Sequence, residues 1–122
     1  MSDNFERRTT AQLVSEFAQV ARRRGEAVLD SDVRRANRMF SLMQAIDHEL
    51  RLRGRDARMA LLPLMEGENR FERYYAAKYL LGLVPDPARR VIEEIATPIY
   101  DALCGDAGMC LYALDKGIFK PD

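Results

Sequence analysis

Apolar residues recur at every third or fourth position along most of this chain, which is the spacing of one buried face of an α-helix. The pattern is clearest over residues 70–96, where it predicts two short helices joined by a turn. The two apolar stripes comprise Tyr74, Ala77, Leu80, Leu81 and Val84, and then Ala88, Val91, Ile92, Ile95 and Ala96. A lone helical hairpin cannot cover its own apolar faces, so we expect the other elements to stack against it.

The turn of this hairpin is marked by Pro85, Asp86 and Pro87. Asp is favoured at the N-cap of a helix, and Pro is favoured at the first helical position. We therefore expect Asp86 to cap the second helix and Pro87 to occupy its first position.

A long helix is predicted near the start of the chain. Thr9 and Gln12 have the spacing of a capping box, so this helix should begin at Thr10. Gly25 could end it. However, the apolar residues on both sides of Gly25 keep the same helical phase, which favours an extension to Leu29.

The longest predicted helix follows, from Val33 to about Arg53, with Gly54 as a natural C-cap. A third helix comes next, and Pro63 should bend or shorten it because proline removes a helical hydrogen bond.

The pattern is interrupted after the hairpin. A helical turn should restart at Thr97 and Pro98, and Gly105 should break it. Asp106 should then cap a last helix that Gly117 closes.

No segment alternates apolar and polar residues at period two over the length of a strand, so the predicted fold class is all-α, with five to six antiparallel helices. Residues 1–8 are polar and are expected to be a flexible N-terminus, and residues 9–122 are expected to form a single helical domain. Ile118 and Phe119 in the tail are expected to dock on the body of the protein.

Composition changes this picture little. The 122 residues are 48% hydrophobic and 31% charged, which is typical of a globular protein, and the net charge is zero. Residues 1–60 hold twelve Arg and nine acidic residues, a net charge of +3, and residues 61–122 hold seven basic and ten acidic residues, a net charge of −3. A protein that binds DNA regardless of sequence usually carries a larger positive excess.

The sequence contains no motif typical of metal binding, cofactor binding or membrane insertion. Cys104 and Cys110 lie six positions apart, and no second pair of Cys or His could complete a zinc site. We therefore interpret both cysteines as small residues packed within the protein, and we expect no cofactor. No N-terminal apolar run and no apolar stretch of about 20 residues occurs, so we expect a cytoplasmic protein with no membrane contact.

The predicted hairpin resembles a HEAT-type repeat. In such repeats an Arg early in the first helix precedes paired alanines and then a leucine, and the matching residues are Arg73, Ala76, Ala77 and Leu80. Glu72 departs from the pattern, because an apolar residue is usual at its position.

A wider set of short matches extends from about Leu13 to Asp122. These are Asn37 with Phe40, Ile46-Asp47 with Glu49-Leu50, Arg53-Gly54, the hairpin, and residues 114–119. With them the chain resembles a small bacterial family of HEAT-like proteins known only as a domain of unknown function, number two-thousand-nineteen. The resemblance implies antiparallel hairpins stacked as a short HEAT-like α-α superhelix, and it implies no particular activity.

Asp47, His48 and Glu49 are the candidates for catalytic chemistry. Consecutive residues on a helix do not converge, so these three do not form a metal site. A solvated histidine is the simpler interpretation of His48. Asp47 falls at the margin of the apolar arc and can pair with Arg51 one turn later, although a buried carboxylate could also act as an acid or base.

Phe71, Tyr75 and Tyr79 form the candidate interaction surface. They recur every four residues on the side of their helix that faces away from its main apolar stripe. Either the helix is sandwiched between two layers, or this aromatic stripe is exposed and binds a partner protein or a second copy of the chain.

Arg34, Arg35 and Arg38 form a candidate basic patch, with Arg22 to Arg24 nearby in sequence. HEAT-like proteins can bind DNA through such patches, but the acidic residues between these arginines favour an ordinary solvated face.

The leading hypothesis is a non-catalytic protein-interaction module, of the adaptor or immunity type, that uses exposed helix faces to bind an unknown protein partner. The alternative is a nucleic-acid-binding domain that uses the basic patch. A small enzyme centred on Asp47, His48 and Glu49 is the least favoured hypothesis.

Overall fold

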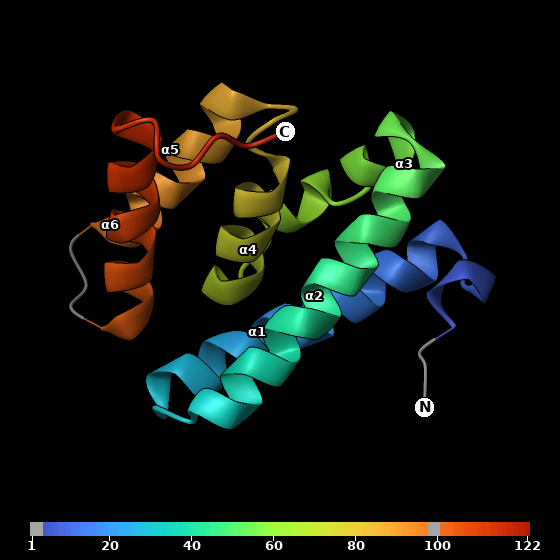
Figure 1. Ribbon diagram of the computed structural model, residues 1–122, viewed down its shortest axis with the longest axis horizontal. Coiled ribbons are helices and arrows are strands. Elements are labelled where there is room, and N and C mark those ends of the chain that lie inside the picture. The colour runs from blue at the N-terminus through green and yellow to red at the C-terminus, as the bar shows by residue number, and fades with distance from the viewer. Residues whose placement is uncertain (1–3, 98–100) are drawn as a thin grey trace.

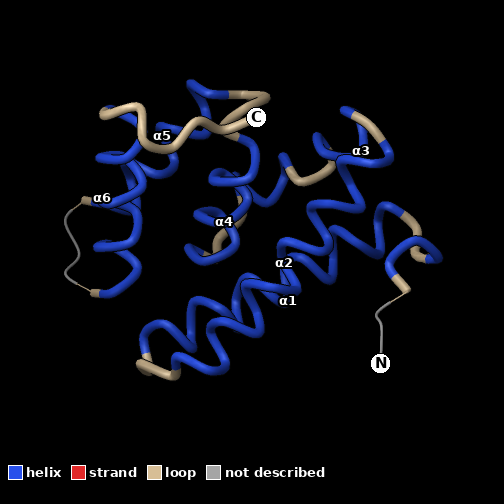
Figure 2. Tube along the Cα trace, viewed as in Figure 1, coloured by secondary structure: helices blue, strands red, loops and turns tan. Residues whose placement is uncertain are grey.

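The computed structural model describes residues 4–97 and 101–122, and over these ranges the protein is all-α. The helices pack antiparallel to their neighbours in sequence (Figures 1 and 2). Six α-helices and two 3-10 helices lie in the described ranges: η1 (Phe5–Arg7), α1 (Thr10–Leu29), α2 (Val33–Arg53), α3 (Arg55–Met59), η2 (Leu62–Glu66), α4 (Arg70–Leu80), α5 (Pro85–Ala96) and α6 (Ala102–Asp115).

The molecule has two helical layers that meet at α4. The long helices α1 and α2 pack along each other, and α5 packs against both α4 and α6. α4 lies between these two groups and contacts α1 (Figure 1).

The two long helices begin and end as predicted. The Thr9 hydroxyl and the Gln12 side chain complete a capping box, and α1 continues through Gly25 to Leu29. The Asp32 side chain caps α2 by accepting a hydrogen bond from the Arg35 amide at 3.1 Å.

Gly25 has a specific role inside α1, because α4 approaches it closely. A Cβ atom at Gly25 would lie 2.7 Å from Cε1 of Phe71, and closer still to Cγ and Cδ1 of the same ring. The missing side chain therefore creates the notch in which Phe71 packs.

The effect of Pro63 is confirmed. The third helix ends at Met59, and residues Leu62–Glu66, which include this proline, form the short 3-10 helix η2.

The start of α5 differs from the prediction. The helix begins at Pro85 with Val84 at its N-cap, so the roles predicted for Asp86 and Pro87 are wrong. Pro85 is itself suited to the first helical turn, where a missing N–H has no partner to lose. The helix therefore starts two residues earlier than the Asp-Pro pair suggests.

The last helix also differs. α6 runs without a break from Ala102 to Asp115, and its cap is Asp101, whose side chain accepts a hydrogen bond from the Cys104 amide at 2.9 Å. The predicted break at Gly105 and the predicted cap at Asp106 are therefore wrong. Buried side chains on the inner face of α6 hold the helix against the body, and this packing outweighs the low helix propensity of glycine.

The C-terminal end of α6 was predicted correctly at Gly117, which adopts a left-handed backbone with φ of 71°. Phe119 packs against the core as expected, but Ile118 is exposed, so the docking predicted for Ile118 is wrong. The helical turn predicted around Pro98 falls on residues 98–100, outside the described residues.

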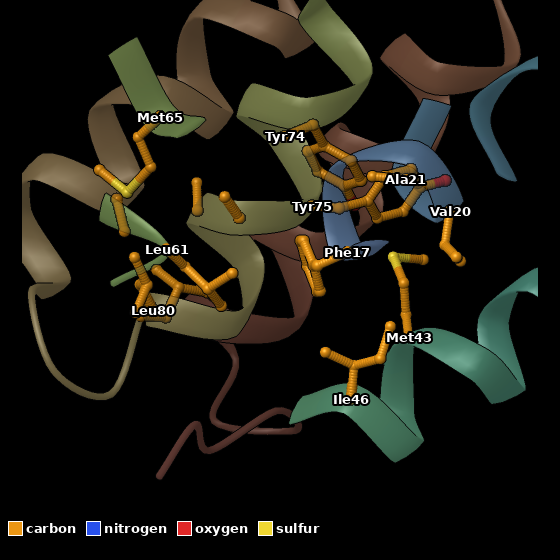
Figure 3. Close-up of a cluster of buried hydrophobic side chains, with 14 of the residues drawn as sticks. Phe17, Val20, Ala21, Met43, Ile46, Leu61, Met65, Tyr74, Tyr75 and Leu80 are labelled. Carbon is orange, nitrogen blue, oxygen red and sulfur yellow. The ribbon is translucent and has the colours of Figure 1, made fainter. Parts of the chain in front are cut away.

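The core runs continuously between the two layers (Figure 3). Phe17 of α1, Met43 of α2 and Tyr75 of α4 meet at its centre, and Leu61 and Leu80 lie toward the η2 side. Burial of such side chains stabilises the fold by about 25 cal/mol for each Å² of apolar surface that is removed from water.

Part of the segment expected to be a flexible N-terminus contacts the rest of the protein. Phe5 is buried, and its carbonyl accepts a hydrogen bond from Nη2 of Arg53 at 3.0 Å. Phe5 and its carbonyl therefore connect this otherwise polar segment to the core and to α2.

Candidate functional site

The aromatic stripe of α4 is not an exposed surface. Tyr75 is only 3% exposed, Phe71 fills the Gly25 notch, and the Tyr79 ring packs edge-on against Phe17 with 5.6 Å between centroids. The candidate interaction surface of Phe71, Tyr75 and Tyr79 is therefore wrong for this chain, and the sandwiched alternative is the one observed. Burial raises the pKa of Tyr75 and of Tyr79, so both phenols stay protonated.

The arginines near the α1–α2 corner are used largely for packing. Nη1 of Arg24 donates to the Ala36 carbonyl at 2.6 Å, and its guanidinium lies 5.1 Å from the centre of the Phe40 ring. Nη1 of Arg22 lies 3.2 Å from Oε2 of Glu72, which ties α1 to α4. These contacts fix helices in place.

The candidate basic patch is divided between two roles. Arg35 is half-buried, and its Nη2 atom lies 3.9 Å from Oε1 of Glu26. Arg34 and Arg38 are exposed and lie one turn apart on α2.

Asp47, His48 and Glu49 have three separate environments. Oδ2 of Asp47 accepts a hydrogen bond from Nε of Arg51 at 2.7 Å, and Oε2 of Glu49 accepts one from Nε of Arg53 at 2.8 Å. His48 is exposed. These residues therefore form no common catalytic centre, and residues 4–97 and 101–122 contain no cluster of His, Cys, Asp and Glu suited to a metal ion.

A cluster of charged side chains surrounds the buried Asp47. The predicted pair with Arg51 is present, and burial raises the pKa of the Asp47 carboxyl even though Arg51 opposes the shift. Arg58 of α3, which is only 9% exposed, lies near this pair, and burial lowers its pKa. Nη1 of Arg51 donates to Oδ1 of Asp122 at 3.1 Å, and Nη1 of Arg58 donates to the Asp122 carbonyl at 3.0 Å.

The return of the tail to α2 and α3 was not predicted from the sequence. No local spacing relates Asp122 to Arg51 and Arg58, which lie 71 and 64 residues away. The only local signal was the four-residue spacing of Asp47 and Arg51.

A cavity of about 220 Å³ lies beside this cluster, between α2, α4 and the tail. Its wall combines aromatic, cationic and amide side chains with the backbone of a turn: Phe40, Gln44, Arg51, Lys78, Tyr79, Gly82, Phe119, Pro121 and Asp122.

The outer face of α6 is the most apolar exposed helix face in the described residues. Met109 and Tyr112 are 65% and 52% exposed and lie one turn apart. The other exposed positions of α6 are Ala102, Gly105, Gly108 and Asp115, so only one of the six carries a charge. The sequence carried a signal for this face, because apolar residues occur on all sides of α6. A helix with one solvated face normally has polar residues on that side.

The two cysteines are packing residues, as interpreted from the sequence. Sγ of Cys104 donates to the Ala96 carbonyl at 2.9 Å, and burial raises the pKa of the Cys110 thiol. A raised pKa disfavours the reactive thiolate.

An all-α protein of antiparallel helices is the class that this geometry defines. The chain belongs to the family described as "Domain of unknown function (DUF2019)", which matches residues 11–115, so the resemblance inferred from the sequence is confirmed.

Among solved structures, the chain is similar to the protein RPA1889 from Rhodopseudomonas palustris CGA009, known from a crystal structure. The two are 40% identical with a TM-score of 0.89, and the match covers 99% of this chain and 100% of the other. A search of curated proteins finds no match. Within the described residues, every helix is too short or too polar to cross a membrane.

Proposed function

We propose that this protein is a non-catalytic protein-interaction module that binds its partner through the outer face of α6. The observation that carries the proposal is the exposure of Met109 and Tyr112 on a helix face that is otherwise made of small residues. Side chains of this kind are enriched at the centres of protein interfaces.

Met109 and Tyr112 have enough side-chain area to stabilise a complex when they are buried. Full burial of a large apolar side chain such as Met109 stabilises a complex by roughly 1.5–3 kcal/mol. Tyr112 adds contact area together with a polar tip, and its ring is ordered at low entropic cost. Two such residues can anchor an interface whose remaining contacts only exclude water.

The chemistry of this face suits an apolar helix of a partner protein. A Cβ atom added at Gly105 or at Gly108 would meet nothing within 4 Å, so the backbone of α6 is open to close approach at both positions. The adjacent groove, lined by Lys78, Asp106, Met109, Cys110, Ala113 and Phe119, has a volume of about 420 Å³ and lies along the same helix. An adaptor or immunity-type protein would use such a face to cover a helix of its target.

The proposal includes a HEAT-like arrangement of the hairpins. Support comes from the buried Ala76 and Ala77 of α4, which allow the close packing of paired helices that such repeats use. In this arrangement α6 is the last layer, and its outer face is where a further layer would stack.

Site-specific crosslinking tests the α6 face. A photo-reactive residue at Met109 should crosslink to one protein in native lysate, with or without nuclease treatment. The same residue at Arg34, on the exposed side of α2, is the matched control and should not give that product. Met109→Glu with Tyr112→Glu should abolish capture while leaving the helical circular dichroism unchanged. Equal capture by this double variant, or a product that forms equally from position 34, would contradict the proposal.

Nucleic-acid binding through the basic patch is the alternative, and the exposure of Arg34 and Arg38 one turn apart is the observation in its favour. Under this alternative, binding to duplex DNA should weaken steeply between 50 and 200 mM salt, and Arg34→Glu with Arg38→Glu should abolish it. We expect neither effect, because Arg22 and Arg24 contact Glu72 and the Ala36 carbonyl, which reduces the number of arginines that face solvent at this corner.

A further inference from the structure

The cavity between α2, α4 and the tail supports a second inference, and it shares Lys78 and Phe119 with the groove beside the proposed partner surface. We propose that this cavity binds a small carboxylic acid with an apolar body, with the carboxylate beside Arg51. Phe40, Phe119 and Pro121 supply apolar wall, and Gln44, Arg51 and Lys78 supply hydrogen-bond donors.

The charge balance of the cavity favours an anion. Three cations lie in or beside it, on Arg51, Arg58 and Lys78, and two carboxylates oppose them, on Asp47 and Asp122. Asp47 already occupies the Nε edge of Arg51, so the Nη1 edge is the part that faces Asp122. If the Asp122 side chain moves away, this edge of Arg51 lacks an acceptor, and the cations of the cavity still outnumber the carboxylates that contact them.

The carboxylate of Asp122 therefore occupies the position beside Arg51 that we assign to the carboxylate of a ligand. Its side chain is almost fully exposed, whereas that of Arg51 is two-thirds buried. An ion pair with one almost fully solvated member contributes little to stability. A ligand that buries its apolar body in the cavity can therefore displace Asp122 from Arg51.

The size of the cavity limits the ligand. About 220 Å³ is roughly seven times the 30 Å³ that one water molecule occupies in the liquid. Pockets for drug-sized molecules typically exceed about 300 Å³. The ligand is thus a small acid, such as an aryl- or alkyl-substituted propanoate, and not a nucleotide or a lipid.

The tail completes the wall through contacts at its end. Nη1 of Arg58 holds the Asp122 carbonyl, and the turn after α4 leaves room for the backbone of Asp122 at Gly82. A Cβ atom at Gly82 would lie 2.7 Å from the Asp122 carbonyl oxygen, and closer still to the carbonyl carbon. Gly82 is therefore what allows the tail to close this side of the cavity.

An NMR titration of the whole chain tests the proposal, with 3-phenylpropanoate as the probe and neutral 3-phenylpropanamide as its matched control. The acid should shift the Gly82 amide and the Gln44 side-chain amide saturably, with a dissociation constant on the order of 1 mM for a ligand of this size. The amide should bind at least tenfold more weakly, because it cannot form a charged hydrogen bond with Arg51. The Gly105 amide, which lines no part of the cavity, should not move.

Three variants locate the binding. Asp122→Asn removes the competing carboxylate and should tighten binding of the acid several-fold, and Lys78→Gln should weaken it. Gly82→Ala should displace the tail and weaken binding at least tenfold, whereas Gly108→Ala is the matched control and should have no effect.

Several outcomes would overturn the proposal. Equal binding of acid and amide, or shifts at Gly82 and Gln44 that inorganic phosphate reproduces, would show that the cavity does not select a carboxylate with an apolar body. Absence of saturable shifts up to 20 mM acid in both the natural protein and Asp122→Asn would exclude the site. Unchanged affinity in Asp122→Asn would place the carboxylate away from Arg51.

Discussion

At the scale of single residues, two glycines inside helices have opposite surroundings. Gly25 in α1 faces the Phe71 ring, whereas Gly108 in α6 is exposed with no atom within 4 Å of an added Cβ. Glycine costs a helix roughly 0.5–1 kcal/mol relative to alanine, so both positions weaken the helix that carries them. Only at Gly25 does packing account for that cost.

The matched substitutions should therefore differ in sign. We expect Gly25→Ala to destabilise the protein by about 1–3 kcal/mol, because the added methyl group overlaps the Phe71 ring. Gly108→Ala should stabilise it by about 0.5–1 kcal/mol. Urea denaturation followed by circular dichroism measures both changes. A stabilising effect of Gly25→Ala would show that α1 and α4 can separate at little cost.

Asp47 gives a second prediction at this scale. Its pKa is raised in the folded state, mainly by burial, so the folded protein binds a proton more tightly than the unfolded chain does. The contribution of Asp47 to stability is thus fully present below the unfolded pKa of about 3.9 and is lost as pH rises through the folded pKa. Relative to Asp47→Asn, the natural protein should lose stability between pH 3.5 and pH 7 in urea titrations. A relative gain over that interval would show that the pair with Arg51 dominates.

At the scale of elements, helix positions followed from the sequence more reliably than helix ends did. The capping box at Thr9 placed the start of α1 correctly because its signal is a local hydrogen bond. The start of α5 and the continuity of α6 were missed because local rules place a break at any glycine or a cap at any aspartate. In α6, the tertiary packing of Leu103, Ala107 and Cys110 keeps the helix continuous across Gly105.

Asp101 connects a helix cap with an ion pair. Its carboxylate caps α6 and also lies 2.6 Å from Nη1 of Arg70, and this arginine lowers its pKa. Asp101→Asn should keep the cap, because Asn is as good an N-cap as Asp, while removing the ion pair.

The resulting stability difference should depend on pH in the opposite sense to that of Asp47. A lowered folded pKa contributes stability above the unfolded pKa of about 3.9, and this contribution is lost as pH falls through the folded pKa. Asp101→Asn should therefore be less stable than the natural protein at pH 7, and the difference should shrink as pH falls through the folded pKa of Asp101. A difference that does not shrink at low pH would assign the effect to the cap, because protonation of Asp101 removes the ion pair.

At the scale of the whole molecule, the sequence predicted the buried helix faces better than it predicted which apolar face stays exposed to solvent. The all-α class and the sandwiched position of α4 were both available from spacing. The α6 face and the tail-closed cavity were not, because each depends on residues far apart in the sequence that meet only in the fold.

Removal of the tail tests this long-range contact. Deletion of residues 118–122 uncovers the core next to Phe119 and leaves the buried Arg58 guanidinium without the Asp122 carbonyl. An unpaired buried donor costs about 1–3 kcal/mol, so we expect the free energy of unfolding to fall by at least that amount. Lys120→Ala, at an exposed tail position, is the control and should change it by less than about 0.5 kcal/mol. A truncated chain as stable as the natural one would show that the tail adds nothing to the core.

The notch at Gly25 also constrains how sequences of this fold can diverge. A methyl group at position 25 overlaps the ring at position 71, so alanine at 25 packs best with a smaller side chain at 71. The two positions should therefore change together during evolution, and the intermediate that combines alanine at position 25 with the Phe71 ring should be the one that selection removes. The contact between α1 and α4 therefore constrains positions 25 and 71 jointly, although they lie far apart in the sequence.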